Sequence, residues 1–525
     1  MQGTGENSGE AVRWVGTVTV RGGTLANNRA DAERLRDALR AETGAEGIDI
    51  DIALLRQLPA QLRKNGGKVR CVVFGHRLVG VLDPDGQAPA CGVAVDLGTT
   101  RVVVRLLDLE TGERLGQSAF DNPQIGIGAD ILTRLHFAGQ AAGLERLQSL
   151  ITAALNLEIA SLCEGAKVAT ASVYLLSVAG NTAMTHLLLG LPTDWMIREP
   201  YIPAVNAPGD LAAASLGLCV NPCARVFVFP NVGSYFGGDL IAGILCSGMH
   251  RRESPAILVD VGTNAEVVMG CSDWLVACAG AAGPALEAGV SKMGMMARPG
   301  VIDRFDLDPV TGALVWHTIA EKPPLGICGS GLIDLVARLY LSGRIDLRGK
   351  LVKERCGGGY VEGEACALVV VPKEVSGTGE DLVISQTELD YFISSKAAMY
   401  TILETLAQSV GTELSAMSRF FVAGTFGSLI DPFSAITLGM LPDLPMALFT
   451  PLGNSSLSGA ARLLTHGESL AEIGRIREAI TYVELNVNQE FMNRFSAAKF
   501  IPHTDPSMFP SAGANSPAAS RDGRR

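Results

Sequence analysis

The first ninety residues combine two hydrophobic periods. Some stretches alternate apolar and polar residues with the period of a β-strand, and others repeat apolar residues with the spacing of an amphipathic helix. The expected elements are a strand at 12–20, helices at 30–43 and 51–64, and a hairpin of strands at 69–74 and 78–82. The turn at 83–86 ends the hairpin. The pattern predicts a small α+β domain over residues 11–88, after a disordered tail at 1–10.

From residue 92 the pattern changes to strands followed by helices, and it starts again near residue 257. The expected elements of the first round are strands at 93–96, 102–108 and about 114–120, and helices near 129–138 and 143–163. In the second round a helix follows Gly331, and another spans about 386–411 behind a Ser385-x-x-Glu388 capping box. A last helix is expected near 488–497.

These elements predict an α/β protein with a duplicated domain over 89–503. The expected first lobe is about 89–255 and the second about 256–465, followed by C-terminal elements to 503. Residues 504–525 are rich in Ser, Ala, Pro and Arg, which predicts a disordered tail.

One motif occurs at the start of each half. Asp96-Leu-Gly-Thr-Thr100 and Asp260-Val-Gly-Thr-Asn264 both follow an apolar run and precede a second β-rich run. The glycine allows close approach of the backbone, Thr hydroxyls and amides suit phosphate, and the aspartate can hold Mg²⁺ or a water. A single Asp-x-Gly also makes ordinary hairpin turns. The duplicate therefore favours a matched nucleotide site over coincidence.

Glycine-rich segments follow these motifs at 280–287, 326–331, 422–427 and 451–456. Gly329 and Ser330 open a predicted helix, so their amides could bind an anion. Gly424 and Gly427 end a predicted strand in a turn suited to packing against a base or ribose. A P-loop, an H-E-x-x-H motif and a G-x-S-x-G motif are absent. Each glycine segment alone is also typical of a plain turn.

Charge, hydrophobic content and cysteine spacing exclude several classes of partner and site. The formal charge of -11 argues against nucleic-acid binding, and no secretion signal is visible. The uncharged window from Val168 to Asp194 contains polar residues, which favours a buried strand and helix start over a membrane span, with His186 as a core residue. The eleven cysteines lack C-x2-C spacing, which favours reduced thiols over a zinc or iron–sulfur site. We expect a cytoplasmic protein.

The two motifs resemble the phosphate motifs of the acetate and sugar kinase, heat-shock-cognate and actin superfamily. More specifically, the chain resembles the ATP-dependent reductive activators of corrinoid proteins over most of 45–503. The segments that carry this resemblance are 121–130, 180–186, 230–239, 279–287, 326–334, 426–432, 482–486 and 500–503.

The resemblance implies two ribonuclease-H-like lobes of the actin and sugar-kinase type, preceded by the small α+β domain at 11–88 as a middle-type domain. It implies an ATPase that helps return a Co(II) corrinoid protein to Co(I) for methyl transfer. By carry-over, Asp96 and Asp260 would be catalytic and would handle Mg²⁺ and water. The implied nucleotide-binding residues are Gly98, Thr99, Thr100, Gly262, Thr263, Asn264, Gly329, Ser330, Gly424 and Gly427. Asp130 and Asp239 would support the metal site from outside its direct ligands or take part in coupling, or they would simply cap helices.

The sequence departs from the resemblance in one respect. Better-known members carry an iron–sulfur centre, commonly in an N-terminal plant-type ferredoxin domain, and no cluster is predicted here. Three explanations are open at this point: a truncated start at Met1, a separate ferredoxin-like protein that supplies the electron, or a role as an ATP-driven conformational partner. A small-molecule kinase and a nucleotide-sensing scaffold are the alternative functions. A homodimer is implied by resemblance alone.

Overall fold

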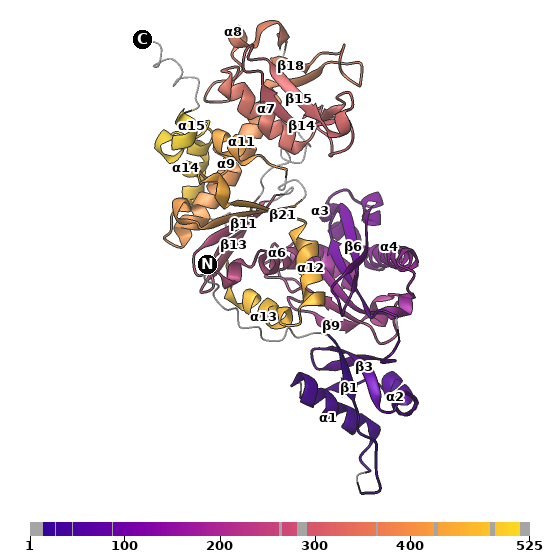
Figure 1. Ribbon diagram of the computed structural model, residues 1–525. Coiled ribbons are helices and arrows are strands. Elements are labelled where there is room, and N and C mark those ends of the chain that lie inside the picture. The colour runs from indigo at the N-terminus through magenta and orange to yellow at the C-terminus, as the bar shows by residue number, and fades with distance from the viewer. Residues whose placement is uncertain are drawn as a thin grey trace. The chain divides into compact units, whose positions relative to one another are not determined.

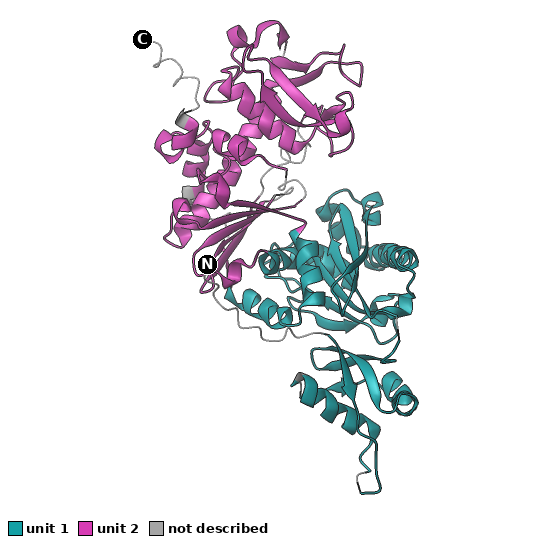
Figure 2. Ribbon diagram, in the orientation of Figure 1, with its two compact units in different colours: residues 1–246, 455–479 teal, residues 247–454, 480–525 magenta. Residues whose placement is uncertain are grey.

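The computed structural model describes residues 14–26, 28–44, 46–86, 88–261, 265–280, 291–363, 366–424, 429–483 and 489–514 (Figure 1). The chain divides into two compact units (Figure 2). Unit 1 comprises residues 1–246 and 455–479, and unit 2 comprises residues 247–454 and 480–525. Within the described residues, no helix is long and apolar enough to cross a membrane.

Unit 1 begins with the small α+β domain that the sequence predicts. Its four-stranded sheet has the order β1-β3-β4-β2, and two helices accompany it. The elements are β1 (Val15–Thr19), α1 (Asp31–Thr43), β2 (Asp49–Ile50), α2 (Ile52–Lys64), β3 (Lys68–Phe74) and β4 (Arg77–Leu82). The apolar stripe of α2 is buried in the core through Leu54, Leu58 and Leu62, as the helical spacing requires.

The larger part of unit 1 is built on a six-stranded sheet of order β7-β6-β5-β8-β10-β9. Its strands are β5 (Cys91–Leu97), β6 (Arg101–Asp108), β7 (Arg114–Asp121), β8 (Val173–Gly180), β9 (Gly209–Ala212) and β10 (Arg225–Val228). Strands β5, β8 and β10 are parallel to one another, whereas β6, β7 and β9 pair antiparallel. The helices are α3 (Ile131–Ala138), α4 (Gly143–Gly165), α5 (Thr182–Leu189), α6 (Gly238–Ser247), α12 (Ser455–Thr465) and α13 (Ser469–Ala479).

Unit 2 repeats this plan on a sheet of order β21-β20-β11-β12-β13-β22. Its strands are β11 (Ala256–Val261), β12 (Ala265–Gly270), β13 (Leu275–Gly280), β20 (Arg419–Ala423), β21 (Phe449–Gly453) and β22 (Ile480–Tyr482). Three consecutive antiparallel strands are followed by two parallel ones, so β13-β12-β11-β20-β21 corresponds to β7-β6-β5-β8-β10. The duplication that the two Asp-x-Gly-Thr motifs suggested is therefore present in the strand topology.

Two small sheets and several helices complete unit 2. The first sheet contains β14 (Val301–Leu307), β15 (Leu314–Thr318) and β16 (Gly326–Ile327), and the second contains β17 (Tyr360–Val361), β18 (Ala367–Val371) and β19 (Leu382–Ser385). The helices are α7 (Gly329–Leu341), α8 (Lys353–Cys356), α9 (Gln386–Ser409), α11 (Pro432–Leu438), α14 (Gln489–Ala498) and α15 (Pro510–Ala514).

Two boundaries differ from the sequence expectation. Residues 455–479 return to unit 1, although the second lobe was expected to continue to about 465. Helix α12 packs on β5 and β8 there, and a Cβ atom at Gly459 would lie 2.0 Å from the Ala242 carbonyl oxygen. This close helix contact needs a glycine and cannot be read from local periodicity.

The expected tail from residue 504 also contains ordered structure up to residue 514. Helix α15 follows Phe509, which is fully buried against the aromatic ring of Tyr400 on α9. The buried Lys396 on the same helix donates to the Phe500 and Pro502 carbonyl oxygens, at 2.5 and 2.6 Å. These contacts attach the C-terminal segment to α9.

Candidate functional site

The first predicted motif lies in the tight turn between β5 and β6. Asp96 is the last residue but one of β5, and Gly98, Thr99 and Thr100 form the turn itself. A Cβ atom at Gly98 would lie 2.2 Å from the Arg101 carbonyl oxygen. Only glycine therefore fits this turn, because the backbone of Arg101 occupies the space that a side chain would need.

Two asparagines from other elements hold this turn in place. The Asn122 side-chain amide donates to the Gly98 carbonyl oxygen at 2.9 Å, and its backbone N–H donates to the Thr100 carbonyl oxygen at 2.8 Å. The Asn181 side-chain amide donates to the Thr99 hydroxyl at 2.9 Å. Asn122 is 1% exposed, so its hydrogen bonds are made in a buried environment where geometry is tightly constrained.

Asn181 reaches the turn because of the sheet register. Strands β5 and β8 are parallel, and Leu97 pairs with Gly180. Asn181 is thus the first residue past the carboxyl end of β8, where it caps α5 by accepting from the Met184 N–H at 2.9 Å. The same side chain therefore fixes both a helix start and the Thr99 hydroxyl.

Asp239 belongs to the same edge of the sheet. It is the second residue of α6, which follows β10, and its carboxylate accepts from the Leu240 N–H at 2.9 Å. A Cβ atom at Gly237 would lie 2.5 Å from the Asn181 Cα and 2.6 Å from an Asp239 carboxylate oxygen. Gly237 thus brings the starts of α5 and α6 close together, beside the Asp96 motif.

The structure accounts for Asp130 and His186 by local hydrogen bonds. Asp130 caps α3 by accepting from the Thr133 N–H and hydroxyl, and these bonds hold the pKa of its carboxyl below its usual value. The buried His186 bonds to the Thr182 carbonyl oxygen at 2.7 Å and accepts from the Ala204 N–H at 3.1 Å. Burial lowers the pKa of His186, which keeps the imidazole neutral. The core role expected for His186 is confirmed.

The second motif occupies the equivalent place in unit 2. Asp260 is the last residue but one of β11, as Asp96 is of β5, and it pairs with Ala423 on the parallel strand β20. Gly424 follows Ala423 with a φ of +85°, a conformation that favours glycine. The predicted residues Gly262, Thr263, Asn264 and Gly427 lie outside the described residues.

Gly329 and Ser330 begin α7, as the glycine-rich pattern predicted. Ser330 is 2% exposed, and its hydroxyl donates to the Asp303 carbonyl oxygen at 3.4 Å and lies 3.2 Å from the Cys328 sulfur. Its side chain is therefore used inside unit 2. Any contribution of this helix start to an anion comes from backbone N–H groups rather than from the serine hydroxyl.

One buried carboxyl group in unit 2 was not singled out from the sequence. Asp334 on α7 is 3% exposed, and burial raises its pKa from 3.8 to about 6, with the nearby Asp431 carboxylate acting in the same direction. One of its oxygens accepts from the Phe305 N–H at 3.4 Å. Asp431 itself caps α11. The sequence signal was an acidic residue within the apolar face of a predicted helix.

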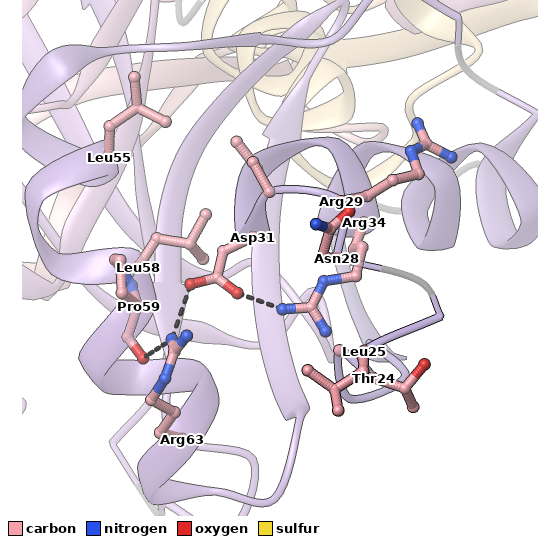
Figure 3. Close-up of a pocket in the computed structure, with 13 residues that line it drawn as sticks. Thr24, Leu25, Asn28, Arg29, Asp31, Arg34, Leu55, Leu58, Pro59 and Arg63 are labelled. Atoms are coloured by element: carbon pink, nitrogen blue, oxygen red, sulfur yellow. Dashed lines mark hydrogen bonds and ion pairs between the residues drawn. The ribbon is translucent and has the colours of Figure 1, made fainter.

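A separate groove of about 740 Å³ lies in the small α+β domain, lined by α1, α2 and the segment that precedes α1 (Figure 3). Arg63 and Arg34 both bind Asp31 there, and the Arg63 contact measures 2.6 Å. These guanidinium groups hold the pKa of the Asp31 carboxyl below its usual value. The groove contains none of the predicted nucleotide residues, so its volume does not identify the phosphate site.

The cysteines, all in the described part of the chain, form no disulfide. Burial raises the pKa of Cys71, Cys91 and Cys278 to about 12, as expected for inert core thiols. Among the described residues, no group of three or more His, Cys, Asp or Glu side chains could hold a metal ion.

The donor set in unit 1 fits the phosphate and Mg²⁺ of a nucleotide. Aspartate carboxylates, threonine hydroxyls and turn amides are oxygen ligands and N–H donors of the kind that hard cations and phosphates require. The glycines at 98 and 237 let the backbone segments of this site pack closely against each other. A duplicated sheet with an aspartate at the same place in each copy defines the actin and sugar-kinase class of ATPases.

Comparison with known proteins specifies the class further. Residues 14–87 match the RACo linker region, 91–252 the RACo middle region, and 254–513 the C-terminal ASKHA domain of RACo. The solved structure of a reductive activator for a corrinoid, iron-sulfur protein is 34% identical, with a TM-score of 0.83 over 96% of this chain and 82% of that chain.

Two curated proteins are also similar. The corrinoid activation enzyme RamQ of Eubacterium limosum is 28% identical over 82% of this chain and 73% of its own length. A reductase of the Co(II) methylated amine-specific corrinoid protein from Methanosarcina barkeri is 24% identical over 77% of this chain and 75% of its own length. The chain belongs to the RACo family of reductive activators, ATP-dependent enzymes that return Co(II) corrinoid proteins to the active state. This confirms the family, the fold class and the activity expected from the sequence.

Proposed function

We propose that the two Asp-x-Gly-Thr turns hold the ATP that drives corrinoid reduction, and that the electron is supplied by a separate ferredoxin-like protein. The observation that carries the proposal is the equivalent position of Asp96 and Asp260, each one residue before the carboxyl end of the first strand of a repeated sheet. Such strand ends are where α/β proteins commonly bind ligands.

In unit 1, the turn amides and the hydroxyls of Thr99 and Thr100 would contact phosphate oxygens. Asn181 would keep the Thr99 hydroxyl oriented, because it donates to that oxygen and leaves its hydrogen available to a phosphate. Asp96 would bind Mg²⁺ directly or through water. Bound Mg²⁺ would neutralise phosphate charge and so favour hydrolysis.

In unit 2, Asp260 would take the corresponding role, with Gly262, Thr263 and Asn264 as phosphate ligands. The start of α7 at Gly329 would add backbone donors, whereas Gly424 and Gly427 would let the backbone approach the adenosine. ATP hydrolysis needs a group that orients and polarises the attacking water, and a carboxylate can do this. Asp260 and Asp96 are the two candidates.

The redox step transfers one electron to Co(II) and gives Co(I), while the donor is oxidised by one electron. ATP hydrolysis provides the free energy that makes this transfer favourable. Within these 525 residues the cysteine spacing matches no cluster-binding motif, so the proposal takes the electron from a centre outside them.

Anaerobic assay of the full chain tests the proposal. Purified protein, MgATP, a chemically reduced ferredoxin and a panel of Co(II) corrinoid proteins are mixed, and Co(I) is followed by visible absorption while ADP is measured in parallel. We expect Co(I) formation that requires both ATP and ferredoxin, and ATP turnover that the corrinoid protein stimulates. ADP formation that no corrinoid protein affects, together with phosphate transfer to a small acceptor, would instead identify a kinase.

A further inference from the structure

Unit 1 carries an exposed apolar patch on two adjoining loops, which we define as Tyr201, Ile202 and Tyr235. Their exposed fractions are 37%, 59% and 48%. The rings of Tyr201 and Tyr235 pack against each other, with centroids 5.8 Å apart. Exposed aromatic residues that are grouped in this way are typical of protein contact sites, where tyrosine is enriched among the residues that dominate binding.

The structure holds the patch in a defined shape. The Ser234 hydroxyl donates to the Tyr201 carbonyl oxygen at 2.6 Å, and the Asn231 N–H donates to the Asn206 carbonyl oxygen at 2.8 Å. Tyr201 has a φ of +59°, an unfavourable backbone conformation for a residue with a bulky side chain. The two loops thus keep a tyrosine exposed at a conformational cost.

Hydrogen bonds connect the patch to the first phosphate turn. Thr182, the first residue of α5, donates its hydroxyl to the Gly233 carbonyl oxygen at 3.0 Å, beside Ser234. The imidazole of His186, one turn further along α5, accepts from the Ala204 N–H. Asn181, immediately before α5, holds the Thr99 hydroxyl. The start of α5 therefore contacts both patch loops and the phosphate turn.

We propose that this patch is the docking surface for the Co(II) corrinoid protein. The inference rests on the proposed function, because it assigns the phosphate turn and the patch to the two substrates of one reaction. Two features favour a corrinoid protein as the occupant. A corrinoid protein is the macromolecular substrate of this family's activity. Its binding must also be coupled to the nucleotide site, and the shared contacts at the start of α5 would provide that coupling. A rigid pair of tyrosines also provides contact area at low entropic cost.

The test compares three full-length variants in the ATP- and ferredoxin-dependent Co(I) assay, with a Co(II) corrinoid protein that the wild type activates. Y201N removes the ring and keeps a residue that tolerates positive φ. Y201F keeps the ring. L157S is the matched control, because Leu157 is 73% exposed on α4 of the same unit.

For Y201N we expect KM for the corrinoid protein to rise at least tenfold, with ATP turnover in its absence unchanged. Y201F and L157S should retain the wild-type KM. An unchanged KM in Y201N would overturn the docking surface and leave the proposed function standing. A tenfold loss of ATP turnover by Y201N in the absence of the corrinoid protein would also overturn the docking surface, because the ring would then support the fold or the nucleotide site. If the wild type activates no member of the panel, both proposals fail.

Discussion

Asparagine side chains position the phosphate turn of unit 1. Asn122 fixes the two backbone carbonyl groups on either side of Thr99, and Asn181 fixes the Thr99 hydroxyl. Neither residue was assigned a role from the sequence. Their own signals were those of ordinary helix caps, and both do cap a helical segment. Their second partner depends on the sheet register, which local sequence does not contain.

Replacing Asn181 by alanine should therefore reduce nucleotide turnover more than it reduces stability. Loss of the cap costs about 1 kcal/mol, whereas misplacement of the Thr99 hydroxyl should lower kcat/KM for ATP about tenfold or more. Steady-state ATPase assays and urea unfolding measure the two effects. Asn156→Ala is the control, because Asn156 also bonds two backbone groups of a loop in unit 1, far along the chain from either motif. Equal kcat/KM losses in both variants would contradict this role.

Asp334 should make unit 2 less stable as the pH rises. Its pKa in the folded protein is raised to about 6, so between pH 4 and 6 the folded state holds a proton that the unfolded state has lost. Stability then falls with rising pH across this window. Asp334→Asn should raise the free energy of unfolding at pH 8 by roughly 1 to 3 kcal/mol and change it little at pH 4. Urea unfolding at both pH values measures this, and an equal change at both would contradict the assignment.

At the scale of elements, the strongest local signals gave the most accurate predictions. The capping box at Ser385 is present, with the Ser385 N–H and hydroxyl both donating to Glu388 and the Glu388 N–H donating back to the Ser385 hydroxyl. The expected helix of 386–411 is observed as Gln386–Ser409. Glu388 also accepts from the Lys292 N–H at 2.7 Å, so this cap connects α9 to a distant segment.

Ser385→Ala should therefore lower the free energy of unfolding of unit 2 by about 1 kcal/mol, through loss of the capping hydroxyl. Chemical denaturation followed by circular dichroism measures the change. Ser394→Ala is the matched control on the same helix, because among the described residues the exposed Ser394 hydroxyl donates to the Asp390 carbonyl oxygen and caps no helix. A control as destabilising as Ser385→Ala would show that the cap adds nothing specific.

Long-range contacts limited what the sequence could predict about elements. Periodicity predicted the strands of both repeats, and the Asp-x-Gly-Thr turns predicted their equivalence. The return of 455–479 to unit 1 depends on Gly459 fitting against Ala242. The order of residues 504–514 depends on burial of Phe509 against Tyr400. Both contacts join residues more than a hundred positions apart, which local sequence does not show. The sequence therefore predicted a second lobe that continues to about 465 and a disordered tail from 504.

At the scale of the whole molecule, the duplicated sheet explains why two aspartates are candidates for one chemical role. Asp96 and Asp260 occupy equivalent strand positions, each in its own unit. Family membership assigns the overall activity. The catalytic role of the two aspartates is our proposal, and it rests on their equivalent positions.

The central claim is that these turns couple ATP to the reduction of a corrinoid protein. The most direct measurement follows the rates of ATP hydrolysis and of Co(I) formation in the same reaction, with reduced ferredoxin present. It compares the wild type with Asp96→Asn, Asp260→Asn and the exposed control Asp273→Asn. We expect both motif variants to lose ATP turnover and Co(I) formation together by about 10²-fold or more, and the control to match the wild type. Co(I) formation at the wild-type rate in either motif variant would contradict the account.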